Sequence, residues 1–200
     1  MTEKGYLIKK KVLFIDLDDT IITTISGNTF PTDVTDFKIR KEVLDKIVDA
    51  FPTLYYVEIV SNQGGIPQFV DEQDFIGKIK AIESFMQKYL RNHTGRNIFV
   101  NSMYCPSHAE IGMRKPNTGM LESYSSWKKS ELIMIGDASG KEGDFSDSDK
   151  QCAENFGIEY IDIEDFLKIK KQKKRGNHLP LLLLMKCRIS HFFQYLVCPR

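Results

Sequence analysis

Short apolar runs alternate with helical patterns along most of the chain. Runs rich in β-branched and aromatic residues predict five strands, at residues 11–16, 55–61, 97–103, 131–136 and 158–162. Apolar residues three or four positions apart predict amphipathic helices at 39–51 and 72–90, with weaker patterns at 117–127 and 147–156. This alternation predicts an α/β fold, a Rossmann-like parallel sheet of about five strands with helices on both faces.

Polar side chains follow three of these runs at the point where each predicted strand ends. Asp16 and Asp18 close the first run, Ser61 and Asn62 close the second, and Asp137 follows the fourth. Ligand sites of parallel sheets lie outside the carboxyl ends of the strands, so we expect these side chains to meet there. Carboxylates at the end of a buried strand are unfavourable unless they bind a metal or a reacting group. The pattern therefore predicts a reactive site at this edge.

The residue types fit phosphoryl transfer. Such a reaction needs a nucleophile, positive charge, and hydrogen-bond donors for the phosphoryl oxygens. Asp16 is the predicted nucleophile, and Asp18 is the predicted general acid and base. We expect Ser61 and the backbone of Asn62 to bind the phosphate, and Lys115 to neutralise its charge.

Mg²⁺ is the expected cofactor, because it takes hard oxygen ligands and usually only one or two carboxylates. Asp16, the backbone carbonyl of Asp18, and Asp137 are the predicted ligands. Asp144 and Asp149 follow in the next polar segment. Each can cap a loop or a helix, and each can instead orient the metal ligands without binding the metal itself. Both interpretations stay open.

A polar segment at residues 21–38 separates the first strand from the first helix, and we expect it to face the site. Thr20, Thr24 and Arg114 are weaker candidates for substrate contacts, and Thr20 serves equally well to satisfy the local backbone. No segment is long enough to form a large cap domain over the site. An uncovered site admits a large substrate, such as the end of a polymer.

The composition of the chain limits the class of protein and the partners that can be expected. The chain has 200 residues, of which 42% are hydrophobic and 28% are charged, and its net charge is +1. These values suit a globular domain without a global positive field, so any contact with nucleic acid must be local. The four cysteines form no Cys-x-x-Cys pair, and no apolar secretion signal precedes the first strand. We expect a monomer inside the cell, in the nucleus or the cytoplasm.

Residues 1–167 are expected to form the catalytic domain, and residues 168–200 a tail that is first basic and then apolar. Six of the eight residues from Lys168 to Arg175 are basic. A solvated helix end, a nuclear-import signal and a nucleic-acid anchor are the interpretations left open. The longest apolar stretch, at 179–185, contains Pro180 and is too short to cross a membrane.

Several motifs together carry a resemblance to a known family. Phe-Ile-Asp-Leu-Asp-Asp-Thr at 14–20 is followed by Thr-Thr-Ile-Ser-Gly at 23–27, Arg-Lys-Pro at 114–116 and Gly-Asp-Ala-Ser-Gly at 136–140. Over roughly residues 10–168 the chain resembles the phosphatase domain of polynucleotide kinase 3′-phosphatase, in the haloacid dehalogenase-like superfamily. The resemblance implies Mg²⁺-dependent removal of 3′-phosphate from nucleic-acid ends, with DNA as the expected polymer, through an aspartyl-phosphate.

Two alternative functions stay open. Small-molecule phosphatases of the histidinol-phosphate or heptose-bisphosphate type share several of these segments and usually add a zinc loop, of which this chain has only Cys105 and His108. A catalytically idle module that binds nucleic-acid ends is the second alternative. The segment at 65–69 lacks the basic residues that such 3′-phosphatases usually carry there. No Gly-x(4)-Gly-Lys-Ser/Thr loop occurs, so we expect neither ATP binding nor kinase activity.

Overall fold

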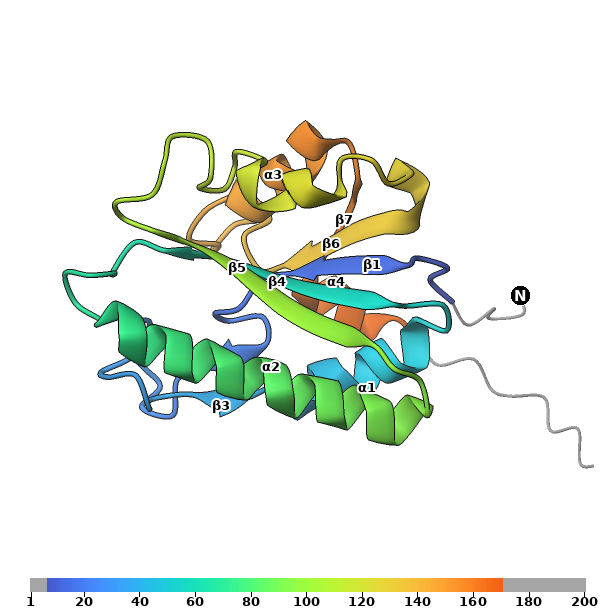
Figure 1. The fold of residues 1–200 in the computed structure, drawn as a ribbon, viewed down its shortest axis with the longest axis horizontal. Helices are drawn as coiled ribbons and strands as arrows, with labels where there is room; N and C mark the ends of the chain where they lie inside the picture. Colours follow the sequence, from blue (N-terminus) through green and yellow to red (C-terminus); the bar gives the residue numbers. More distant parts are fainter. Residues whose placement is uncertain (1–6, 171–200) are drawn as a thin grey trace, which may run out of the picture.

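A computed structural model describes residues 7–170 and contains a central parallel sheet of five strands (Figure 1). The spatial order of its strands is β5-β4-β1-β6-β7, and all four pairings are parallel. The strands are β1 (Val12–Ile15), β4 (Tyr56–Gln63), β5 (Phe99–Pro106), β6 (Leu132–Gly136) and β7 (Glu159–Asp162). The five predicted strands and their parallel arrangement are confirmed.

Helices cover both faces of the sheet (Figure 1). On one face lie α1 (Lys41–Ala50), α2 (Glu72–Thr94) and α4 (Ile163–Lys168). On the other lie α3 (Ser148–Phe156) and the 3₁₀ helix η1 (Gly119–Tyr124), with the short η2 (Lys129–Glu131) before β6. The weak pattern at 117–127 therefore gives a 3₁₀ helix in place of an α-helix, because a glycine opens it and two serines follow it.

Strand β1 lies in the middle of the sheet and has a core on each side. The side chains of Leu13 and Ile15 belong to the core under α1, α2 and α4, whereas Val12 and Phe14 belong to the core under α3 and η1. All four are fully buried. A strand covered on both faces reads as a continuous apolar run, which explains why the sequence identified β1 so clearly.

The polar segment at 21–38 contains a short antiparallel ladder, which the sequence did not predict. It pairs β2 (Ile22–Thr23) with β3 (Lys38–Ile39), and we call residues 17–40 the flap. The Asp36 carboxylate holds the flap together, because it accepts hydrogen bonds from the Ser26 backbone (2.8 Å), the Ser26 hydroxyl (2.6 Å) and the Thr32 backbone (2.9 Å). As expected, residues 7–170 contain no large cap domain.

Helix α4 was also missed by the sequence patterns. Its N-cap is Asp162, whose carboxylate accepts hydrogen bonds from the backbones of Glu164 and Asp165. Only six residues long, it falls below the length at which helical periodicity can be recognised. Most of the predicted tail, residues 171–200, lies outside the described residues. None of the helices within 7–170 is long and apolar enough to span a membrane.

The Asp36→Asn variant tests the flap. Donors from Ser26 and Thr32 hold the pKa of Asp36 well below its usual range. A lowered pKa stabilises the fold above the ordinary aspartate value of about 3.9, and the stabilisation disappears as the pH falls through the folded-state pKa. We therefore expect urea unfolding to show a lower free energy of unfolding for the variant at pH 7, and a gap that closes under strong acid. Glu154→Gln, which removes an exposed charge on α3, serves as the control. A gap independent of pH would contradict this role of the carboxylate.

Candidate active site

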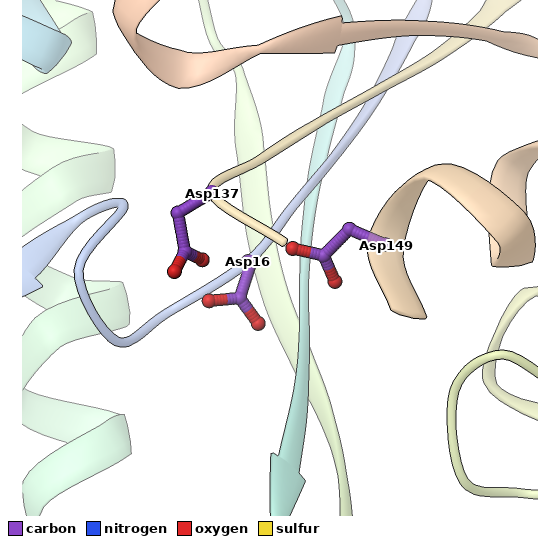
Figure 2. Close-up of side chains that lie close together, drawn as sticks. All are labelled: Asp16, Asp137 and Asp149. Atoms are coloured by element: carbon purple, nitrogen blue, oxygen red, sulfur yellow. The ribbon is translucent and has the colours of Figure 1, made fainter. Parts of the chain in front are cut away.

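Three carboxylates from distant parts of the chain meet at the carboxyl edge of the sheet (Figure 2). Asp16 follows β1, Asp137 follows β6, and Asp149 lies in the first turn of α3. One oxygen from each lies within 4.8 Å of the others. Asp149 thus joins Asp16 and Asp137 directly, although the sequence offered it only as a residue outside the ligand set.

Lys115 is the counter-charge of this cluster. Its ammonium group is buried, forms an ion pair with Asp16 Oδ1, lies 2.6 Å from Asp149 Oδ1, and donates to the Val60 carbonyl at 2.8 Å. Asn62 fixes the backbone of the lysine, because its Oδ1 accepts from the Lys115 amide at 2.9 Å and its Nδ2 donates to the Lys115 carbonyl at 3.0 Å. The side chain of Asn62 therefore positions Lys115, and its backbone stays the predicted phosphate contact.

A glycine makes room for Asp149 beside the sheet. A Cβ at Gly136 would lie 2.1 Å from Asp149 Oδ2, which is far inside any allowed contact. The same oxygen accepts a hydrogen bond from the Ala138 amide at 3.2 Å, and the Tyr160 hydroxyl donates to the Gly136 carbonyl at 2.9 Å. The glycine of the Gly-Asp pair thus allows α3 to present its acid at the end of β6.

The electrostatics of the cluster favour a divalent cation. Burial raises the pKa of Asp16 well above its usual value, and the nearby Asp149, Asp137 and Asp18 add to the rise, while Lys115 opposes it. Burial and Asp149 raise the pKa of Asp137 to about 6. For Lys115, burial lowers the pKa, but Asp16 and Asp149 outweigh it and the net shift is upward. Three carboxylates and one ammonium leave two negative charges, and the donors are all hard oxygens, so the residues fit Mg²⁺.

Asp18 lies apart from this trio and is linked to the predicted phosphate site by a residue that the sequence analysis missed. Gln63 Nε2 donates to Asp18 Oδ2 at 2.7 Å and to Ser61 Oγ at 2.8 Å. The Ser61 side chain is itself buried. The available signal was the position of Gln63 at the end of β4, only two residues after Ser61. Gln63 orients both the predicted acid and the predicted phosphate-binding hydroxyl.

The remaining predicted residues lie in different surroundings. Thr20 is fully buried, and its hydroxyl donates to Asp137 Oδ1 at 3.2 Å. Its side chain therefore contacts the acidic cluster from inside the protein. Thr24 donates to the Asn28 carbonyl at 2.7 Å within the flap, so its hydroxyl is already used. Asp144 accepts from the Ser139 hydroxyl at 2.7 Å and organises the loop after β6. It is therefore not brought into the carboxylate cluster.

Arg114 is exposed beside the site and lies over the turn after β4. Its guanidinium nitrogens are 3.2 Å from the position that a Cβ at Gly64 would take.

Cys105 is buried with its thiol 3.6 Å from the Pro106 carbonyl, and His108 is exposed. Within residues 7–170, the acidic trio is the one group of three or more side chains with metal-ligand geometry.

Comparison with known proteins agrees with this fold. The D,D-heptose 1,7-bisphosphate phosphatase of B. bronchiseptica, solved with magnesium and phosphate, superposes with a TM-score of 0.50 at 17% identity, covering 75% of this chain and 78% of that one. The arrangement is that of the haloacid dehalogenase-like α/β fold. Residues 11–167 match the family described as polynucleotide kinase 3 phosphatase. The chain belongs to this family.

Curated relatives support the same assignment. The bifunctional polynucleotide phosphatase/kinase of Schizosaccharomyces pombe is 34% identical over 168 residues, which are 78% of this chain but only 37% of that protein. The polynucleotide 3′-phosphatase of Saccharomyces cerevisiae is 28% identical over 200 residues, covering 74% of this chain and 84% of that protein. The chain thus spans little more than a third of the first relative and most of the second.

The Gly136→Ala variant tests the packing at the acidic cluster. The new methyl group would displace Asp149 and deprive Lys115 of one partner, and overpacking alone costs about 1–3 kcal/mol. We expect lower stability in chemical denaturation and a large loss of phosphatase activity. Gly77→Ala is the matched control, because it adds the same methyl group within α2 where nothing lies within 4 Å. Wild-type stability and activity in Gly136→Ala would show that Asp149 is not held against Gly136.

Proposed function

We propose that this chain is a phosphomonoesterase that removes the 3′-phosphate from the end of a nucleic-acid strand. The observation that carries the proposal is the ion-paired cluster in which Lys115 lies between Asp16 and Asp149 and Asp137 completes the group. This cluster combines a carboxylate nucleophile with a fixed positive charge and a set of hard oxygen ligands, as phosphoryl transfer requires.

In the proposed reaction, Asp16 attacks the phosphorus and the bond to the 3′-oxygen breaks. Its Oδ1 is held by Lys115, while among residues 7–170 no hydrogen-bond donor reaches Oδ2, which we assign as the attacking oxygen. Asp18 gives its proton to the departing 3′-oxygen, and the hydroxyl end leaves. Asp18 then takes a proton from water, the water attacks the aspartyl-phosphate, and Asp16 and inorganic phosphate are released.

Phosphate binding uses the residues around the nucleophile. The Ser61 hydroxyl and the Asn62 backbone would donate to the phosphoryl oxygens, and Lys115 would balance their negative charge. Asp16, Asp137 and the Asp18 carbonyl would hold Mg²⁺, with Asp149 beside them. When bound, the ion supplies further charge stabilisation and orients the phosphate.

Two features support nucleic acid as the substrate. Residues 7–170 contain no large cap domain over the site, so a polymer end can approach it. The family and two of its curated relatives are described by polynucleotide phosphatase activity. We propose DNA as the polymer and a monomer as the working unit. We also propose that the chain lacks kinase activity, because its 200 residues contain no phosphate-cradling Gly-x(4)-Gly-Lys-Ser/Thr loop.

The Asp16→Asn variant should lose essentially all turnover while its unfolding transition remains cooperative, because the amide keeps the volume but is not a nucleophile. Asp19→Asn is the matched control. It removes one charge from an exposed neighbour whose φ of 53° is well tolerated by asparagine. We expect the control to retain most of its activity on 3′-phosphorylated DNA. Near wild-type hydrolysis by Asp16→Asn would refute the nucleophile assignment.

A substrate panel tests the proposed function. We expect Mg²⁺-dependent release of phosphate from a 3′-phosphorylated oligonucleotide, no release after chelation, and much slower release from its 5′-phosphorylated isomer and from histidinol phosphate. Elemental analysis should find no stoichiometric zinc in the purified protein. If histidinol phosphate gave the higher kcat/KM by orders of magnitude, the small-molecule alternative would replace this proposal. If no phosphate ester were hydrolysed, a binding module would be the better description.

A further inference from the structure

A lysine on α2 contacts the flap and takes no part in the chemistry described so far. Lys78 is half-buried in the second turn of α2, and its Nζ lies 5.0 Å from the centroid of the Phe37 ring in the flap. Phe37 in turn packs against the core under α1 and α2. The amino end of α2 and the flap lie near each other at this side of the molecule (Figure 1). Lys78 is therefore placed between the helix and the flap.

The ammonium group of Lys78 has anionic neighbours but no ion-pair partner among residues 7–170. Burial lowers the pKa of Lys78, whereas Asp18 and Asp36 are close enough to oppose that shift. The Asp36 carboxylate is already used by Ser26 and Thr32, and Asp18 Oδ2 accepts from Gln63. Within the part of the chain that the structure describes, no carboxylate forms an ion pair with Lys78. A half-buried cation in this state is unfavourable unless it has an anion to bind.

The ring of Phe37 does not replace such an anion. The face of a phenylalanine ring attracts a lysine ammonium, but this contact leaves all three N–H donors of the ammonium unused. The available donors and the unbalanced charge therefore point to an anionic group of the substrate.

The face of the sheet from which Lys78 approaches indicates which anionic group this is. The terminal phosphate is expected beside Asp16, where Lys115 already supplies a buried cation from the α3 side of the sheet. Lys78 approaches from the opposite face, under which α1 and α2 pack. Asp18 is the proposed acid for the departing 3′-oxygen, so the terminal sugar would lie beside it. In a strand, that same sugar carries the next phosphate on its 5′-oxygen.

We propose that Lys78 binds the phosphodiester on the 5′ side of the terminal nucleotide and thereby distinguishes a polynucleotide from a nucleoside 3′-monophosphate. This inference rests on the proposed function, because it assumes a strand whose terminal 3′-phosphate occupies the site. Lys78 would thus contact one phosphate of the strand. The 63–70 segment, which follows the predicted phosphate-binding residues, contains no basic residue that could do so.

The test compares kcat/KM for a 3′-phosphorylated oligothymidylate and for thymidine 3′-monophosphate. In Lys78→Gln we expect the ratio of the two values to fall about tenfold, the size of one charged hydrogen bond. The dependence of log kcat/KM on log salt for the oligonucleotide should flatten by about 0.7, the slope expected for one lost phosphate contact on a single strand. Lys78→Arg, which keeps the charge, should restore most of the ratio.

Lys88→Gln is the matched control, since it removes the same charge from an exposed position farther along α2. It should leave both the ratio and the salt dependence at wild-type values. An equal loss of activity on both substrates in Lys78→Gln would assign Lys78 a structural role in the flap and overturn the proposal, as would an unchanged ratio. Failure of the proposed function would look different, because the wild-type protein itself would then not hydrolyse the 3′-phosphorylated oligonucleotide.

Discussion

The buried ion pairs of Lys115 are the interaction on which the rest of the site depends. One ammonium lies between Asp16 and Asp149, and a third acid, Asp137, is close by. Removing one partner from such a buried arrangement costs about 3–5 kcal/mol, because the remaining charge is left without compensation. The surrounding parts of the structure hold this group in place. Asn62 fixes the backbone of Lys115, and Gly136, which has no side chain, leaves room for the carboxylate of Asp149.

The parallel sheet explains why these charges can meet. Adjacent strands β1, β4 and β6 end at the same edge, and their final residues or the next ones along the chain carry Asp16, Ser61 and Asp137. Helix α3 returns along one face and brings Asp149 to the same point, while α2 runs along the opposite face with Lys78. The site is thus approached from both faces of the sheet, with Lys115 and its ion pairs on one side and the proposed strand-binding Lys78 on the other.

The pattern of the sequence predicted most of this architecture because its strongest signals are local. The central strands β1 and β6 are short and apolar throughout, and the acid that directly follows each of them marks the edge where ligands bind. Three elements were missed or mistaken for equally local reasons. The flap ladder has two residues per strand and α4 has six residues, so neither offers enough periodicity to be recognised. The pattern at 117–127 was recognised as helical, but the helix that forms there is the six-residue 3₁₀ helix η1.

The sequence by itself determined the fold class, the order of the strands along the chain and the acids at their ends, because burial and periodicity are properties of neighbouring residues. The tertiary structure decided which of those residues meet. Lys115 contacts Asp16 across 99 positions of the chain, and Gln63 reaches Asp18 across 45. Asp149 entered the cluster, and Asp144 and Thr24 stayed out of it, because the sheet order and the packing of α3 fix distances that no local pattern contains.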